Sequence, residues 1–263
     1  GGGECGNGEY FHAGTVRADQ RLSIRPAKRV SSPLPLATKG PSMPRIALIH
    51  ALQHSIAPIN AAFARDWPQA RRQNLLDDSL SADLAQGGRG LDAAMHARFQ
   101  TLAQYAVDQG AGGILFTCSA FGPCIEAVAR RHAGLPVLKP NEAMVDQAVA
   151  WAAAHPGRRV ALLATFGPTL QSMPPEFPPG VALLPCLVEG AMAALDAGDG
   201  ATHDRLVAEA ARRLMEAEPG VGAIALAQFS LARAREAVQQ ATGLPVLTTV
   251  DSAVAELRRR LSR

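Results

Sequence analysis

Cys118 is the residue whose type and position best suit chemistry. It follows an apolar run over residues 113–117, which predicts a strand, and precedes Pro123, where a helical pattern begins. A thiol at a strand end, in front of a helix N-terminus, meets backbone N–H donors and a partial positive charge, which favour the thiolate. We therefore expect a lowered pKa for Cys118 and a role as nucleophile or as acid and base. The alternative is a small buried apolar residue, which we expect for Cys124 and Cys186.

The stretch that holds Cys118 occurs twice in the chain. Residues 220–247 repeat residues 110–138 at an offset of 110, and both copies contain Gly-Leu-Pro-Val. In the second copy Gln228 takes the place of Cys118. A carboxamide donates and accepts hydrogen bonds but has no acid–base equilibrium near neutral pH. The two copies therefore supply one group that can carry a proton and one that cannot.

The elements that must position these two residues follow an α/β pattern. Residues 45–49 and 159–163 are matching short apolar runs, which are typical of buried parallel strands. Longer amphipathic segments separate such runs, and residues 91–109, for example, predict a helix. Strands that alternate with helices indicate parallel sheets. The repeat therefore predicts an α/β fold of two pseudo-symmetric lobes, each a parallel sheet flanked by helices, with the active site in the interlobe cleft.

The domain boundaries follow from the same pattern. We expect the first α/β lobe over residues 43–157 and the second over residues 158–247. Residues 248–263 predict a C-terminal helix that packs back on the first lobe. Residues 1–42 show neither a helical nor an alternating apolar period, so we expect a disordered extension without a function.

The composition argues against several classes of partner. Residues 1–42 hold six basic and three acidic residues, so the rest of the chain is near neutral and shows no basic surface for a nucleic acid. No apolar run approaches the about 18 residues of a membrane span, so we expect no membrane partner. The four cysteines are few and scattered, which favours a reducing compartment, and we expect a cytoplasmic protein.

Cofactor and metal chemistry find little support in the sequence. No glycine-rich dinucleotide motif and no P-loop follows a predicted strand. Lys139 is the only lysine outside residues 1–42, which leaves one candidate for a pyridoxal Schiff base. His50 and His54 stand four residues apart without an acidic motif on a helix. We expect neither a cofactor nor a metal.

The candidate site lies at the polar tips of the predicted strands, because ligands of open parallel sheets bind beyond the carboxyl ends of the strands. Next to Cys118, the small Ser119 and Ala120 leave their backbone amides open to a carboxylate or an oxyanion. For His50, the alternative to a ligand contact is a tip histidine that bonds to the backbone. The tips are residues 50–55, 77–79, 117–120, 165–169 and 228–230.

Three parts of the sequence resemble a known superfamily. They are Phe116-Thr117-Cys118-Ser119, Leu163-Ala164-Thr165 with Pro168-Thr169, and the paired Gly-Leu-Pro-Val segments. Their order and spacing resemble the aspartate/glutamate/hydantoin racemase superfamily, which also contains maleate isomerases and arylmalonate decarboxylases. The resemblance covers essentially all of residues 43–263.

The resemblance implies a cofactor-independent racemase or isomerase that acts at the α-carbon of a small carboxylate or amino-acid-like substrate. One cysteine from each lobe would face that carbon, and Cys118 matches the first of them. It also implies a homo-oligomer. The residues that would bind the substrate are Ser119 and Ala120 with their amides, Thr165 and Thr169 from the second lobe, and His50, Gln53, Asp77, Phe229 and Ser230 around the cavity.

Gln228 is the departure from this pattern, because it stands where the second cysteine is expected. Symmetric two-base racemisation then lacks its second base. Chemistry that needs one thiol stays open: decarboxylation with protonation on one face, isomerisation by addition to an activated double bond, or elimination. The alternative of another class is a protein that binds a small carboxylate without turnover.

Overall fold

The computed structural model describes residues 45–86 and 90–262, which belong to one compact unit. The extension predicted over residues 1–42 lies outside the described residues. Within the described part, the strands form two four-stranded sheets. No helix there is long and apolar enough to cross a bilayer.

The first sheet has the strand order β2-β1-β3-β4, and all its neighbouring strands are parallel. Helices connect the strands, as a parallel arrangement requires. The elements in chain order are β1 (Arg45–His50), η1 (Gln53–Ser55), α1 (Ile56–Asp66), β2 (Arg71–Leu76), α2 (Ser79–Gln86), α3 (Ala93–Asp108), β3 (Ala111–Phe116), η2 (Ser119–Phe121), α4 (Gly122–Arg131) and β4 (Val137–Leu138).

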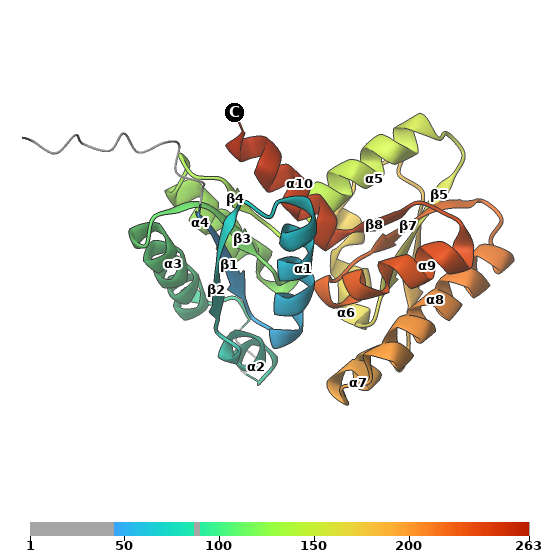
Figure 1. The fold of residues 1–263 in the computed structure, drawn as a ribbon, viewed down its shortest axis with the longest axis horizontal. Helices are drawn as coiled ribbons and strands as arrows, with labels where there is room; N and C mark the ends of the chain where they lie inside the picture. Colours follow the sequence, from blue (N-terminus) through green and yellow to red (C-terminus); the bar gives the residue numbers. More distant parts are fainter. Residues whose placement is uncertain (1–44, 87–89, 263) are drawn as a thin grey trace, which may run out of the picture. The chain divides into compact units, whose positions relative to one another are not determined.

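The second sheet repeats this order as β6-β5-β7-β8, again with parallel neighbours. Its elements, preceded by the helix that follows β4, are α5 (Glu142–Ala154), β5 (Arg159–Ala164), α6 (Gly167–Ser172), η3 (Pro174–Glu176), β6 (Leu183–Leu187), α7 (Ala191–Asp196), α8 (Gly200–Ala217), β7 (Val221–Leu226), η4 (Phe229–Ala234), α9 (Arg235–Thr242), β8 (Val246–Thr248) and α10 (Thr249–Leu261). The predicted fold class, two related lobes with helix-flanked parallel sheets, is confirmed (Figure 1).

The central strands are apolar throughout because both of their faces are buried. Side chains alternate between the faces of a strand. In β1, Ala47 and Ile49 therefore join one core cluster with α3 and α4, while Ile46 and Leu48 join another with α1 and α10. The strands of the second lobe divide their side chains between two clusters in the same way.

The helices that follow the last strand of each sheet pack on the opposite lobe. α10 follows β8 of the second sheet, yet Val250, Val254 and Leu257 pack with residues of β1. α5 follows β4 of the first sheet, yet Met144 and Ala148 pack with residues of β5. Figure 1 shows α10, in red, beside α1, and α5, in yellow-green, beside the second sheet. The sequence boundary expected at residue 157 assigned α5 to the first lobe, whereas its packing partners belong to the second.

Three short helices differ from the sequence expectations. α2 and α6 begin inside segments expected to be irregular tips, and α7 was not predicted. Each spans only six to eight residues, which is too short for a helical apolar pattern to identify it. β6 spans Leu183–Leu187 and pairs with β5 up to Ala164.

Candidate active site

Cys118 occupies the position between β3 and the helical segment that follows, as the sequence predicts. It is half-buried, has extended backbone angles (φ −127°, ψ 122°) and precedes η2 directly. It lines a narrow crevice that has no room for a water molecule. The other residues that line this crevice are Ile49, His50, Ala51, Leu80, Phe99 and Phe116.

Burial raises the pKa of the Cys118 thiol, so the predicted lowering is wrong. The desolvation of the thiolate is the larger effect, and hydrogen bonds from the Ala120 N–H and the Ser81 hydroxyl only partly offset it. The α-helix behind the thiol begins at Gly122, after a 3-10 turn, and the field of a helix terminus falls off within about one turn. Cys118 is therefore a protonated thiol near neutral pH.

Ser81 is a residue that the sequence analysis missed. It lies on α2, and its hydroxyl is also 3.1 Å from the carbonyl of Ala51, so its one hydrogen bonds either this carbonyl or the Cys118 sulfur. The hydroxyl thus connects the end of β1 with the thiol at the end of β3. No local sequence signal marks this residue, because its partners come from other segments of the chain.

Gln228 takes the matching position after β7, with similar backbone angles (φ −139°, ψ 148°). Its Oε1 accepts hydrogen bonds from the backbone N–H of Thr165, at 2.6 Å, and from the Thr165 hydroxyl, at 2.9 Å. A backbone N–H can only donate, so the atom that faces it must be the amide oxygen. The two bonds hold the carboxamide in one orientation, and Nε2 takes no part in them.

His50 is fully buried at the end of β1 and uses both ring nitrogens within the protein. Nδ1 lies 2.9 Å from the Thr117 hydroxyl, and Nε2 lies 3.0 Å from Oδ1 of Asn74. Burial lowers the pKa of His50, and the bond to Asn74 offsets this only in part. His50 is a neutral imidazole that links three strand ends, and it keeps no nitrogen for the predicted ligand contact.

Asp77 is occupied in a similar way. Its carboxylate accepts hydrogen bonds from Arg98 Nη2, at 2.7 Å, and from Ser79 Oγ, at 2.6 Å. Burial alone would raise the pKa of Asp77, but these two bonds together hold it below its usual value. Arg98 also pairs with Asp83, so one guanidinium is shared by two carboxylates at the end of β2.

The other predicted site residues divide by exposure. Phe229, Ser230 and Thr169 are buried, and the Phe229 ring packs in the core cluster of β1, α1 and α10. This placement gives Phe229 a packing role in place of the predicted substrate contact. Gln53 and Ala120 are exposed, and Ser119 and Thr165 are half-buried.

The residues at the strand tips form two groups. Cys118 lies with Ala51, Ser81 and Ala120 in the first lobe, and Gln228 lies with Thr165 in the second. Among the described residues, no hydrogen bond joins the first group to the second. No group of three or more His, Cys, Asp or Glu side chains in the same residues could hold a metal ion.

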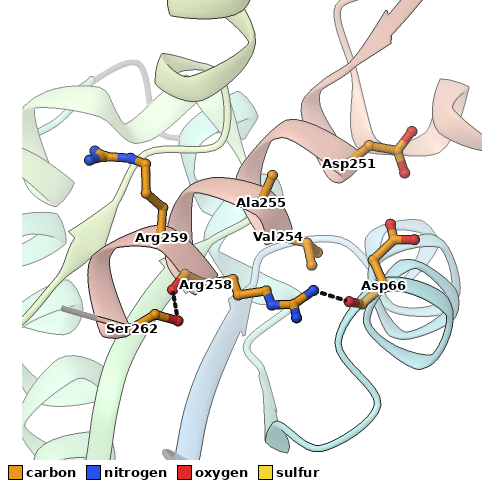
Figure 2. Close-up of a pocket in the computed structure, with 7 residues that line it drawn as sticks. All are labelled: Asp66, Asp251, Val254, Ala255, Arg258, Arg259 and Ser262. Atoms are coloured by element: carbon orange, nitrogen blue, oxygen red, sulfur yellow. Dashed lines mark hydrogen bonds between the residues drawn. The ribbon is translucent and has the colours of Figure 1, made fainter.

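A larger cavity, of about 420 Å³, lies elsewhere, along α1 and α10. Figure 2 shows Arg258 reaching across it to the backbone carbonyl of Asp66, at 2.9 Å. Its two acids are already paired, since Arg65 bonds to both Asp66 and Asp251. Its lining includes no cysteine and no histidine, so we assign the site to the strand tips. The lining residues are Asp66, Asp251, Val254, Ala255, Arg258, Arg259 and Ser262.

Comparisons with known proteins agree with this arrangement of the fold. The family model described as Asp/Glu/Hydantoin racemase matches residues 54–257. A glutamate racemase of Bacillus anthracis aligns with a TM-score of 0.63 at 11% identity, over 84% of this chain and 82% of that one. The allantoin racemase of Klebsiella pneumoniae aligns with a TM-score of 0.62 at 20% identity, over 83% and 88%.

A mutant of arylmalonate decarboxylase aligns with a TM-score of 0.56 at 19% identity, over 82% of this chain and 92% of that one. These identities are low, so the three structures support the fold alone. A search of curated proteins finds no match.

Proposed function

Because the chain belongs to the Asp/Glu/Hydantoin racemase family, we propose that it is a cofactor-independent enzyme that transfers a proton at the carbon α to a carboxylate. Cys118 carries the proton, and Gln228 binds the substrate without exchanging one. The observation that supports this division most is the pair of bonds from Thr165 to Gln228 Oε1, since they hold the carboxamide in one orientation.

Cys118 acts as the proton donor in this proposal. Its burial raises the pKa, so the thiol holds its proton near neutral pH. When that proton moves to a carbanion, the resulting thiolate accepts hydrogen bonds from the Ala120 N–H and the Ser81 hydroxyl. Water then returns a proton to the sulfur.

Gln228 stabilises negative charge on the substrate. A carbanion at the α-carbon delocalises onto the neighbouring carboxylate, and preorganised N–H donors favour that charge. The Nε2 hydrogens of Gln228 are such donors, because Oε1 is already held by Thr165. The backbone amide of Ser119 supplies a further donor beside Cys118.

Two reactions use this arrangement. An isomerase reaction fits the family: the minor thiolate form of Cys118 removes the α-proton. The resulting thiol then returns the proton, either to a neighbouring carbon or to the opposite face of the α-carbon after the intermediate has rotated in the site. Decarboxylation is the second candidate: a C–C bond breaks, CO2 leaves, and the Cys118 thiol protonates the remaining enediolate on one face. The raised pKa of Cys118 favours the second, because that reaction starts from a protonated thiol.

Proton NMR in D2O tests the proposal and separates the two reactions. Glutamate, aspartate, allantoin and phenylmalonate are suitable substrates, because the names of the structural relatives point to such compounds. Isomerisation exchanges the α-proton without loss of carbon, whereas decarboxylation releases CO2 and places one deuterium at the α-carbon.

The matched variants are Cys118→Ala and Cys186→Ala. We expect the first to lower turnover by at least about a hundredfold, because it removes the proton carrier. The second should keep turnover, because Cys186 lies on β6 outside the site. Full turnover by Cys118→Ala would contradict the proposal. Binding of a carboxylate by the wild-type protein without any turnover would also contradict the proposal and would favour the non-catalytic alternative.

A further inference from the structure

Four large apolar side chains are exposed at the carboxyl ends of the strands. Leu52 is 44% exposed and Leu76 42%, at the ends of β1 and β2. Phe166 is 57% exposed and Leu187 45%, at the ends of β5 and β6. Tyr105 on α3 is a further exposed large apolar residue of the described chain, and it lies away from the strand ends. The exposed apolar surface is therefore concentrated where we place the site.

The two pairs are copies of one arrangement. Leu76 is the register partner of His50, and Leu187 is the register partner of Ala164, so each is the last residue of the outer strand. Leu52 and Phe166 each follow the neighbouring strand by two residues, with nearly equal backbone angles (φ −142°, ψ 135° and φ −132°, ψ 116°). The same apolar pair therefore occurs in both copies of the repeat, and none of its members belongs to a core cluster of the described residues.

One member of each pair, Leu76 or Leu187, lies on the sheet face through which the lobes pack. Leu76 shares the face of Ile46 and Leu48, which α1 and α10 cover. Leu187 shares the face of Leu183, which belongs to the cluster of α5. β1 is the direct neighbour of β3, and β2 lies one strand further, at about 5 Å per step. Leu76 therefore ends a strand that lies two steps from the strand before Cys118, at the same carboxyl edge of the sheet.

Cations are missing from the same strand ends. Residues 50–55, 77–79, 117–122, 165–169, 187–190 and 228–230 contain no lysine and no arginine. Two cations lie at neighbouring strand ends, and both are paired: Arg98 from α3 with Asp77 and Asp83, and Lys139 after β4 with Glu126. A second carboxylate on a substrate would have no free cation to meet, whereas an apolar group would cover exposed apolar surface.

We propose that the substrate carries an apolar α-substituent, alkyl or aryl, which the pairs Leu52–Leu76 and Phe166–Leu187 contact. This inference rests on the proposed function, because it takes the strand ends as the substrate site. It assigns the four residues to substrate selection, while Cys118 and Gln228 act on the carboxylate end. A substrate with a second charged group in that position binds more weakly.

Calorimetric titration of the Cys118→Ser variant tests the inference, since that variant removes the proposed proton carrier. The probes are phenylacetate, which has one carboxylate and an apolar group, and glutarate, which has two carboxylates. We expect phenylacetate to bind at least about tenfold more tightly than glutarate. Phe166→Ser and Leu187→Ser should each weaken phenylacetate about tenfold, the effect of exposing one apolar side chain again.

Tyr105→Ser is the matched control, and its phenylacetate affinity should equal that of the parent. Equal or tighter binding of glutarate, no binding of either probe, or unchanged phenylacetate affinity in both tip variants would each overturn the inference. Sedimentation velocity identifies the rival occupant: self-association that Phe166→Ser abolishes, with unchanged phenylacetate affinity, would assign the apolar pairs to an interface between copies. Failure of the proposed function would appear separately, as turnover that does not require Cys118 in the wild-type background.

Discussion

At the scale of single residues, the acidity of Cys118 depends on two opposing effects. Its place at a strand end suggests a reactive thiolate, but the crevice formed by Leu80, Phe99 and Phe116 removes the sulfur from water. Desolvation disfavours the charged form more than two hydrogen bonds favour it. The thiol is therefore suited to donate a proton before it acts as a base.

The raised pKa predicts slow alkylation of Cys118 at neutral pH. Only the thiolate reacts with iodoacetamide, so a raised pKa leaves a smaller reactive fraction at pH 7 than in an ordinary cysteine. We expect the rate of alkylation to increase steadily with pH and to level off only above the usual thiol range. Mass spectrometry of the Cys118 peptide measures this rate. A plateau reached below pH 8 would contradict the assigned direction.

Ser81 predicts a change in that profile. Its hydroxyl stabilises the Cys118 thiolate, so Ser81→Ala should raise the pKa further and move the alkylation curve to higher pH. Ser81→Thr, which keeps a hydroxyl, should restore the curve. The control is Ser79→Ala. Ser79 lies on the same helix as Ser81, but its hydroxyl bonds to Asp77. If the alkylation curve of Ser81→Ala is not shifted, the Ser81 hydroxyl does not stabilise the Cys118 thiolate.

At the scale of elements, the two repeat tips differ in the residue that follows Cys118 or Gln228. In the first lobe it is Ser119, a half-buried small side chain. In the second lobe it is Phe229, which enters the cluster of β1, α1 and α10. The segment η4 is thereby anchored on the first lobe, and Gln228 is held at its start. The tip that cannot exchange a proton is also the tip that packs on the opposite lobe.

Phe229→Ala should destabilise the fold strongly. Phe229 is 4% exposed, and the loss of a buried ring leaves a cavity that costs about 3–5 kcal/mol in unfolding free energy. Phe166→Ala is the matched control, because its exposed ring should change that free energy by about 0.5 kcal/mol or less. Urea unfolding followed by circular dichroism measures both values. Similar values for the two variants would contradict the buried placement of Phe229.

At the scale of the whole molecule, the lobes are joined because α5 and α10 each pack in the core of the opposite lobe. Arg260 of α10 bonds to Glu142 of α5, and Ser252 bonds to Gln147, so these two helices also contact each other. The exposed pair of His54 and Asp196 adds a contact between η1 and α7, of the kind that contributes about 1 kcal/mol or less. Apolar packing by these helices dominates the connection.

The buried His50 predicts an acid-dependent loss of stability of the whole fold. Burial lowers its folded pKa below the unfolded value of about 6.5, so the unfolded chain binds a proton first as the pH falls. The unfolding free energy should therefore decrease below about pH 6.5, until the folded protein also takes up the proton. Urea unfolding at pH 7.5 and pH 5.5 measures this decrease. His50→Gln should reduce the difference between the unfolding free energies at pH 7.5 and pH 5.5. If that difference stays the same, groups other than His50 cause the loss of stability.

Much of the architecture could be predicted from the sequence because its signals are local. Strands buried on both faces require continuous apolar runs, and residues 45–49 and 159–163 are such runs. The repeat at an offset of 110 predicted two related sheets and placed Cys118 and Gln228 at matching positions. Short helices such as α2 and α7 were missed, because six to eight residues are too few to show the spacing of apolar residues that identifies a helix.

The chemical state of the site was decided by tertiary contacts. The pKa of Cys118 depends on a crevice and a hydroxyl supplied by α2 and α3, and the orientation of Gln228 depends on Thr165 from another strand. The sequence by itself determined which residue types end the strands, because strand pattern and repetition are properties of neighbouring residues. Only the folded chain determined how those residues ionise and where they point, because desolvation and hydrogen bonding act between segments that are distant along the chain.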